Sequence, residues 1–173
     1  MGLTLLRHAP PYREYHGCYN GHTDIPIDTT LFEHSKIQTL LHRSFDRVYS
    51  SDLQRCTTTL ETMGITAFTA DPRLREVRFK PFIEGKTFAQ VEASEDFYPH
   101  CLDSQESWHE HICDEPFEIF KARIESFLNE LPKDKNILIC THAGTIRMIL
   151  SLLNSSITHK PLVYLSHITV SLG

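Results

Sequence analysis

The 173-residue sequence has no apolar run near the ~20 residues that a membrane-spanning helix requires. Its first residues, Met1 to Leu6, reach the charge of Arg7 too soon for a secretory signal. N-myristoylation would need Ser or Thr at the position of Leu6. We therefore expect a cytoplasmic protein that has no membrane partner.

The sequence also has no excess of positive charge. It contains 17 Lys and Arg against 22 Asp and Glu, which gives a formal net charge of −5. Electrostatics therefore give little support to a nucleic-acid partner, and we expect none. A small basic pocket for an anion is still compatible with this balance, because net charge does not describe local clusters. Nothing in the sequence indicates an oligomeric state.

No C-x-x-C pair occurs among the five cysteines, so the sequence indicates neither a zinc ribbon nor a disulfide framework, and we expect reduced thiols. The segment His109-Glu110-His111-Ile112-Cys113 holds the most plausible alternative metal ligands. His109 and His111 are two residues apart, however, which on a helix places them on different faces. We expect no metal and no cofactor.

The sequence shows no internal repeat, low-complexity tract or linker, and we expect one domain over residues 1–173. Short β-rich apolar runs alternate with stretches of helical period, which predicts an α/β fold with a mainly parallel sheet. Strands are predicted at 2–6, 47–50, 65–69, 136–140 and 162–172. Helices are predicted at 31–43, 51–63, 117–131 and 143–153, with short helical pieces at 88–91 and 108–112.

The predicted helices carry apolar stripes at helical spacing. The residues expected to face the core are Leu53, Cys56, Leu60, Met63, Phe117, Phe120, Ile124, Phe127, Leu128, Leu131, Ile146, Ile149, Leu150 and Leu153. We expect a capping box of Ser51 and Gln54 to begin the second helix. Pro10-Pro11 predicts an extended loop that runs to about Asp28.

Basic side chains follow several predicted strands at comparable places. Arg7 and His8 close the strand predicted at 2–6. Arg55 lies in the first turn of the helix that follows the strand at 47–50, and His142 follows the strand at 136–140. Ligands bind beyond the carboxyl ends of strands in open parallel sheets. The helix starting near Ala143 would add backbone N–H groups and the positive end of its dipole. The pattern predicts a phosphate site.

These residue types suit phosphoryl transfer, which requires the charge on the phosphoryl oxygens to be neutralised while attacking and leaving groups align. Arginine offers a planar fork of donors that matches phosphate. An imidazole between cations stays neutral and is available as a nucleophile. With 11 histidines in the chain, spacing alone leaves a structural role for His8 and His142 equally open.

Four segments, in order, resemble motifs of the histidine phosphatase superfamily, the phosphoglycerate mutase-like family. Leu6-Arg7-His8-Ala9 resembles R-H-G, and residues 49–59 resemble S-S-x-L-x-R-[AC]-x-x-T. Residues 74–86 resemble L-x-E-x-x-F-G-x-W-E-G-K, and residues 139–144 resemble [ST]-H-G-G. The resemblance implies a three-layer sandwich with helices on both faces of the sheet.

The resemblance also implies roles for these residues in hydrolysis of a small-molecule phosphomonoester. His8 would be the phosphorylated nucleophile, and Glu76 would act as general acid and then as general base. The residues expected to hold substrate are Arg7, Arg55, His142 and Ala143. No metal would be needed.

Residues 17–27 resemble the G-x-C-Y-G-x-T-D-x-P-L stretch of α-ribazole phosphatases. This resemblance implies α-ribazole 5′-phosphate as substrate, in assembly of the cobalamin lower ligand, with Asn20 and Thr23 facing it. Asp24 is expected either to brace this loop or to serve the site directly. Glu84 is expected to line the pocket or to pair with a neighbouring Lys or Arg.

The sequence departs from the family pattern at Ala9 and Ala143, which replace glycine, and at Phe82, which replaces tryptophan. These changes remove no reactive group but alter the expected pocket shape, and the methyl group of Ala9 is expected to approach the phosphate. The alternatives are a phosphatase for another small phosphate or for phosphohistidine protein, a mutase-type enzyme, and a non-catalytic module that binds a phosphate ligand.

Overall fold

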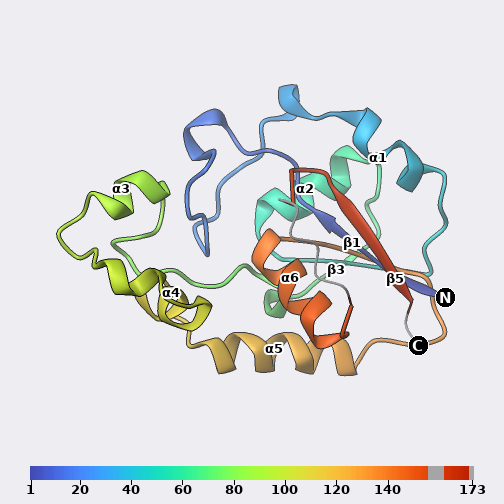
Figure 1. Ribbon diagram of the computed structural model, residues 1–173. Helices are drawn as coiled ribbons and strands as arrows, with labels where there is room; N and C mark the ends of the chain where they lie inside the picture. The colour runs from blue at the N-terminus through green and yellow to red at the C-terminus, as the bar shows by residue number, and fades with distance from the viewer. Residues whose placement is uncertain (156–161, 172–173) are drawn as a thin grey trace.

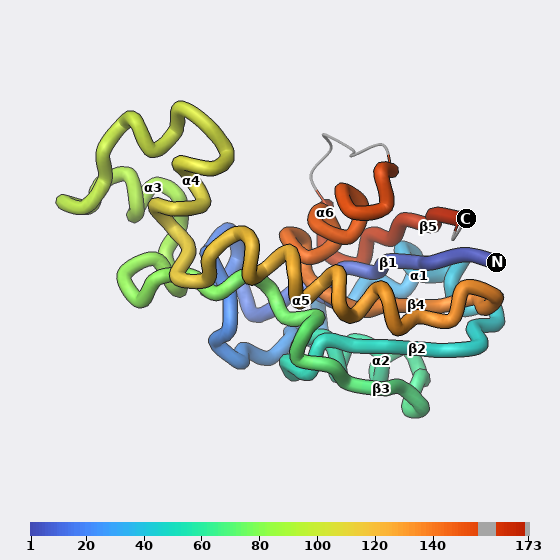
Figure 2. Tube along the Cα trace, turned by 90° about the horizontal axis from the view of Figure 1, so that it is seen from below, coloured from blue at the N-terminus to red at the C-terminus, as the bar shows by residue number. Residues whose placement is uncertain are grey.

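A computed structural model describes residues 1–155 and 162–171. Its five-stranded sheet has the order β3-β2-β4-β1-β5, and Figure 2 shows the strands side by side in this order. The strands are β1 (Gly2–Arg7), β2 (Arg47–Ser50), β3 (Thr69–Ala70), β4 (Ile137–Thr141) and β5 (His167–Ser171). All neighbours pair in parallel except β5, which is antiparallel to β1. The predicted mainly parallel sheet is confirmed.

Helices cover both faces of this sheet (Figure 1). They are α1 (His34–Leu41), α2 (Gln54–Thr62), α3 (Phe88–Glu92), α4 (Gln105–Ile112), α5 (Phe117–Asn129) and α6 (Ala143–Leu152). Short 3-10 turns lie at Arg13–Tyr15, Thr29–Leu31, Pro72–Leu74 and Pro99–Leu102. Among the residues described, no helix combines the length and apolar character needed to cross a membrane.

The alternation of side chains along β1 explains the layers. Leu3 and Leu5 are fully buried in a cluster with apolar residues of α5 and α6. Leu6 belongs to a second cluster, with residues of α1 and α2. Successive side chains of a strand point to opposite faces, so one strand supplies both layers of core. The predicted three-layer α/β sandwich is confirmed.

The central strand β4 brings the ends of its neighbours into register. All five of its residues are buried, as expected for a parallel strand covered on both faces. It lies between β2 and β1, with Cys140 opposite Ser50 and Thr141 opposite Arg7. The three carboxyl ends therefore meet at one edge of the sheet. The segment carrying α3 and α4 lies beyond this edge (Figure 1).

The predicted capping box of Ser51 and Gln54 is wrong. The helix begins at Gln54, and its N-cap Leu53 makes no side-chain cap. Asp24 takes that role from the preceding loop, because its Oδ1 accepts a hydrogen bond of 2.7 Å from the Gln54 amide. Ser51 is fully buried and its hydroxyl lies 2.9 Å from a nitrogen of His142. Asp24 therefore braces the loop against α2.

Other predicted elements are present but shorter. The helix predicted over 31–43 is α1, and the strand predicted over 65–69 is reduced to the edge pair of β3. The last strand begins at His167, and residue 172 lies outside the described part of the chain. Phe117 was expected in the core but is 47% exposed, because it is the first residue of α5. Leu153 lies beyond the end of α6 and is half-buried.

The Asp24 cap can be tested by measuring stability. Replacing an N-capping side chain with alanine removes an acceptor for a helical N–H and a charge favoured by the helix dipole. We expect Asp24→Ala to lower the free energy of unfolding by about 1 kcal/mol in urea. Asp96→Ala is the control, because Asp96 is exposed and makes no hydrogen bond among the described residues. Equal effects of the two substitutions would contradict the cap.

Candidate active site

The candidate site lies where β1, β2 and β4 end. Backbone hydrogen bonds continue past the strands: the His8 amide donates to Thr141 (3.0 Å) and the Ser51 amide to Cys140 (2.9 Å). His142 directly follows β4 and is the N-cap of α6. The sheet thus fixes the backbone of the residues that follow its strands, as the sequence pattern predicted.

His8 is buried and held in one tautomer. Its Nδ1 lies 2.7 Å from the carbonyl oxygen of Ala9. Since a carbonyl can only accept, Nδ1 carries the hydrogen and Nε2 keeps its lone pair. Burial, together with the charges of Arg55 and Arg7, holds the pKa of His8 well below its ordinary value of 6.5. The ring is therefore neutral at pH 7, with Nε2 available as a nucleophile.

His142 faces His8, with 5.3 Å between the ring centroids. The Arg55 Nε donates to His142 Nδ1 at 3.1 Å, so the hydrogen of this ring is on Nε2 and is donated to Ser51 Oγ. Burial, together with the charge of Arg55, holds the pKa of His142 well below 6.5. The two imidazoles are thus both neutral but present opposite tautomers.

Arg55 joins the long loop to this pair. Its guanidinium is fully buried in the first turn of α2, as predicted. Nη1 donates to the Thr23 carbonyl at 2.8 Å, and Nη2 donates to the carbonyls of Gly21 (2.6 Å) and Asn20 (3.2 Å). With its bond to His142, this one side chain positions both the loop and an imidazole.

Arg7 precedes His8 and packs against Tyr164. Its guanidinium carbon is 4.0 Å from the ring centre of Tyr164, a cation–π distance, and Nη1 donates to the carbonyl of Leu162. Its Nε is buried and has no hydrogen-bond partner among the described residues. Such a donor is costly to leave unpaired, and an anion beside His8 would satisfy it.

Glu76 lies at the N-terminus of α6. Its Oε2 accepts from the Gly144 amide at 2.9 Å, and its Oε1 accepts from the amide of Val77 at 3.0 Å. A Cβ on Gly144 would overlap the Glu76 carboxylate. Glycine is therefore required at 144 for this carboxylate to reach the helix terminus.

The backbone around Glu76 is held from α5. Arg123 donates from Nη2 to the Glu76 carbonyl (3.0 Å) and from Nη1 to the Arg75 carbonyl (2.9 Å). Glu115 fixes this guanidinium through Nε and Nη2, at 2.7 and 3.0 Å. His22 donates to the same Glu76 carbonyl at 2.9 Å. Sequence reasoning did not identify Arg123, because the carbonyls that it binds around Glu76 are more than 40 residues away in the chain.

Of the two loop residues expected to face substrate, one bonds to the loop backbone and the other is exposed. Asn20 Nδ2 donates to the Tyr15 carbonyl at 2.8 Å, and the side chain of Thr23 is exposed. Glu84 Oε1 accepts from the amides of Gly21 (2.9 Å) and Thr23 (3.2 Å). Glu84 was expected to line the pocket or to pair with a neighbouring Lys or Arg, but in the described structure it accepts backbone hydrogen bonds that shape the loop.

The three departures from the family pattern lie in different surroundings. Ala9 is fully buried and belongs to the cluster on the α1–α2 side, so its methyl group packs in the core and does not line an open pocket. Ala143 is half-buried as the first residue of α6. Phe82 is half-buried, with its ring 6.2 Å from that of His111.

The histidines weighed as metal ligands have separate surroundings. The Nε2 of His109 donates to the Glu115 carbonyl at 2.8 Å, whereas His111 is buried among aromatic rings, including Tyr98 at 5.0 Å and Trp108 at 5.7 Å. Within residues 1–155 and 162–171, no group of three or more His, Cys, Asp or Glu side chains is placed to hold a metal ion.

Tyr164 is a site residue that the sequence did not reveal. Its ring lies 5.6 Å from that of His8 and 5.5 Å from that of His16. It precedes β5 in a turn, outside every motif, so only the antiparallel pairing of β5 with β1 brings it to the site. The available signal was an aromatic residue inside the strand predicted over 162–172, of which only the part from His167 is a strand.

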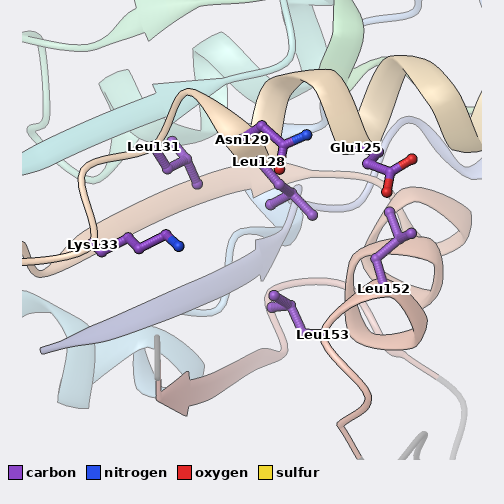
Figure 3. A pocket seen from close by; sticks show the side chains of 7 residues that line it. All are labelled: Glu125, Leu128, Asn129, Leu131, Lys133, Leu152 and Leu153. Atoms are coloured by element: carbon purple, nitrogen blue, oxygen red, sulfur yellow. The ribbon is translucent and has the colours of Figure 1, made fainter.

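The cavity in Figure 3 is remote from these residues. It lies between the C-terminal ends of α5 and α6, and its walls are Glu125, Leu128, Asn129, Leu131, Lys133, Leu152 and Leu153. The length of α6, about 15 Å, separates it from His142.

Two other cavities border the site. One, of about 430 Å³, includes His16 and Tyr164. The other, of about 300 Å³, includes Val77 and Gly144.

Comparisons with known proteins show which sequences and folds this chain resembles. The chain is 30% identical to an adenosylcobalamin/alpha-ribazole phosphatase of Salmonella typhimurium, over 100% of this chain and 87% of that protein. It is 30% identical to a broad-specificity phosphatase of Saccharomyces cerevisiae, over 97% of this chain and 77% of that protein. The crystal structure of the alpha-ribazole phosphatase from Shigella flexneri superposes with a TM-score of 0.76 at 25% identity, covering 98% of this chain and 89% of that one.

The model of the histidine phosphatase superfamily (branch 1) matches residues 3–171. This match includes β1 with the Arg7-His8 pair, the Arg55 helix, and His142 at the start of α6. The chain belongs to the histidine phosphatase superfamily.

Proposed function

We propose that the chain hydrolyses phosphate monoesters through a phosphohistidine at His8 and needs no metal ion. Its family and its relatives make it a phosphatase. The observation that carries the mechanism is the state of His8: a buried, neutral ring with a free Nε2, whose pKa is lowered by burial and by the charges of Arg55 and Arg7. This arrangement supplies both the nucleophile and the positive charge that a metal ion supplies in other phosphatases.

In the first step, Nε2 of His8 attacks phosphorus in line with the departing oxygen. The P–N bond forms as the P–O bond breaks, and the ring acquires positive charge that the Nδ1–H bond to Ala9 stabilises. Arg7, Arg55 and His142 hold the phosphoryl oxygens, together with the N–H groups at the start of α6 that Ala143 begins. For His142, whose ring N–H is donated to Ser51 Oγ in this structure, this means exchanging that hydrogen bond for one to a phosphoryl oxygen. The carboxyl group of Glu76 protonates the leaving alcohol.

In the second step, the same carboxylate takes a proton from water. The resulting hydroxide attacks phosphorus, breaks the P–N bond and restores neutral His8. Microscopic reversibility allows Glu76 to serve as acid in one step and base in the next. Asn20 and Thr23 would approach substrate only through movement of their loop, which Arg55 and Glu84 hold by its backbone.

The substrate we propose is α-ribazole 5′-phosphate. The bacterial relatives named for this activity match the whole chain, and residues 17–27 resemble the corresponding loop. The yeast relative favours the second candidate, a phosphatase that accepts several small phosphates. A braced Glu76 argues against phosphohistidine protein as substrate, since a nitrogen leaving group has less need of an acid. Retention of every reactive group argues against a non-catalytic module.

Removing the nucleophile tests the mechanism. We expect His8→Ala to lower kcat for α-ribazole 5′-phosphate by at least about a thousandfold, as for other covalent nucleophiles. His42→Ala, at an exposed position after α1, is the matched control and should retain activity. The assays contain a metal chelator. Activity of His8→Ala close to the wild type, or loss of wild-type activity in chelator, would contradict the proposal.

The role of Glu76 is tested by varying the leaving group. Loss of a general acid should cost about 100-fold to 10,000-fold with an alkyl phosphate. We expect Glu76→Gln to show this loss in kcat with α-ribazole 5′-phosphate and a much smaller loss with p-nitrophenyl phosphate, whose leaving group needs no proton. Gly144→Ala should reproduce the pattern, because it displaces the same carboxylate. Equal losses on both substrates would contradict the assignment.

The lowered pKa of His8 predicts how stability depends on pH. Between this lowered pKa and 6.5, the imidazole binds a proton only in the unfolded chain, so the free energy of unfolding falls as the pH falls. His8→Gln lacks this proton uptake. From about pH 7.5 to about pH 5, we expect the wild type to lose about 1 to 2 kcal/mol more than His8→Gln in urea unfolding. Parallel pH profiles would show that His8 titrates normally.

A further inference from the structure

A cavity of about 300 Å³ adjoins the Glu76 side of the site. Its walls come from α4, α5, α6 and the segment after Glu76, and they include Val77, Phe79, Trp108, Phe117, Phe120, Gly144 and Arg147. An adjacent cavity of about 240 Å³ shares the last four of these residues and extends along α6 to Ser151. We call this space the α4–α6 groove.

The groove begins where the leaving group departs. Gly144 lines it, and the Gly144 amide holds the Glu76 carboxylate that would protonate the leaving oxygen. Val77, the next residue after Glu76, also lines it. The other cavity beside the site borders Tyr164, which packs on Arg7 and is therefore on the side of the phosphate clamp. An alcohol that received its proton from Glu76 would therefore have the α4–α6 groove beside it.

The walls of the groove suit a flat apolar group. Phe79, Trp108, Phe117 and Phe120 all contribute aromatic surface to it. Phe117 is 47% exposed although it is large and apolar, and its ring stands edge-on to His109 at 5.5 Å. Aromatic walls bind planar rings by stacking and edge contacts. The volume is at the lower end for small-molecule sites, which fits one fused ring system beside a sugar.

We propose that the α4–α6 groove binds the aromatic base of a nucleoside-like phosphate ester and that Phe117 determines specificity there. This inference rests on the proposed phosphatase mechanism and adds where the alcohol binds. The phosphate is held at the strand ends, the sugar oxygen lies at Glu76, and the base lies between α4 and α5. The base then contributes binding energy away from the reacting phosphorus, which raises kcat/KM for esters that carry it.

Two substrates with the same leaving oxygen isolate this contribution. α-Ribazole 5′-phosphate and ribose 5-phosphate both lose their phosphate from the 5′ oxygen, but ribose 5-phosphate has no base. The readout is the ratio of their kcat/KM values. We expect Phe117→Ala to lower this ratio by about fivefold to tenfold, the effect of losing one aromatic contact. A ratio within about twofold of the wild type would overturn the proposal.

Ile119→Ala provides the matched control. Ile119 is on the same helix and is 59% exposed, but it lines none of the cavities described above. It should leave the ratio unchanged, and far-ultraviolet circular dichroism verifies that both variants fold. If Ile119→Ala lowers the ratio as much as Phe117→Ala, the effect belongs to α5 in general and the proposal fails.

Binding of the base can also be followed without turnover. Trp108 is the single tryptophan of the chain and lines the groove, so its fluorescence should change saturably on addition of free α-ribazole. Phe117→Ala should weaken this binding, and Ile119→Ala should not. No saturable change in the wild type would overturn the proposal.

The base-binding role of the groove and the identity of the substrate are separate hypotheses, and each can be contradicted without the other. If the wild type turns over ribose 5-phosphate but not α-ribazole 5′-phosphate, the substrate is wrong. The groove is then tested with adenosine 5′-monophosphate in place of α-ribazole 5′-phosphate, using the same ratio and the same two variants. A Phe117-dependent preference for the adenine ester supports the groove, and no preference for it overturns the groove.

Discussion

The buried guanidinium of Arg55 is the interaction on which the site depends most. Burying a charge without partners is costly, and here the partners are the loop carbonyls at residues 20, 21 and 23 and the ring of His142. The same hydrogen bonds that compensate its burial therefore fix the loop and the tautomer of one imidazole. Its charge also keeps His8 neutral. One side chain thus links folding of the loop to the protonation state of His8, the proposed nucleophile.

A second constraint fixes the position of the Glu76 carboxylate, the proposed general acid. Glu76 reaches the start of α6 only because Gly144 has no side chain. Arg123 and its partner Glu115 hold the Glu76 backbone from α5. The carboxylate is therefore fixed from two directions, by a helix N-terminus and by an arginine that bonds to backbone carbonyls. The leaving-group side of the site and the α4–α6 groove share these elements.

Sequence reasoning predicted the parts of the fold and site that follow from local pattern. Strand ends carrying Arg7, His8 and His142 are visible from apolar runs, and the parallel sheet brings them together as expected. Contacts that depend on distant backbone atoms were not predictable. Asp24 replaces Ser51 as the cap of α2 from 30 residues away, and Tyr164 reaches His8 only through the pairing of β5. Substrate roles of Asn20 and Thr23 stay predictions.

The central claim is that His8 carries the phosphoryl group between the two steps. The most direct test is rapid quenching of a reaction with phosphorus-labelled α-ribazole 5′-phosphate in the presence of chelator, followed by peptide mapping by mass spectrometry. The account predicts an acid-labile, base-stable label on the peptide that contains His8, formed at a rate at least equal to turnover. Turnover with no trapped label, or a label on another residue, would contradict it.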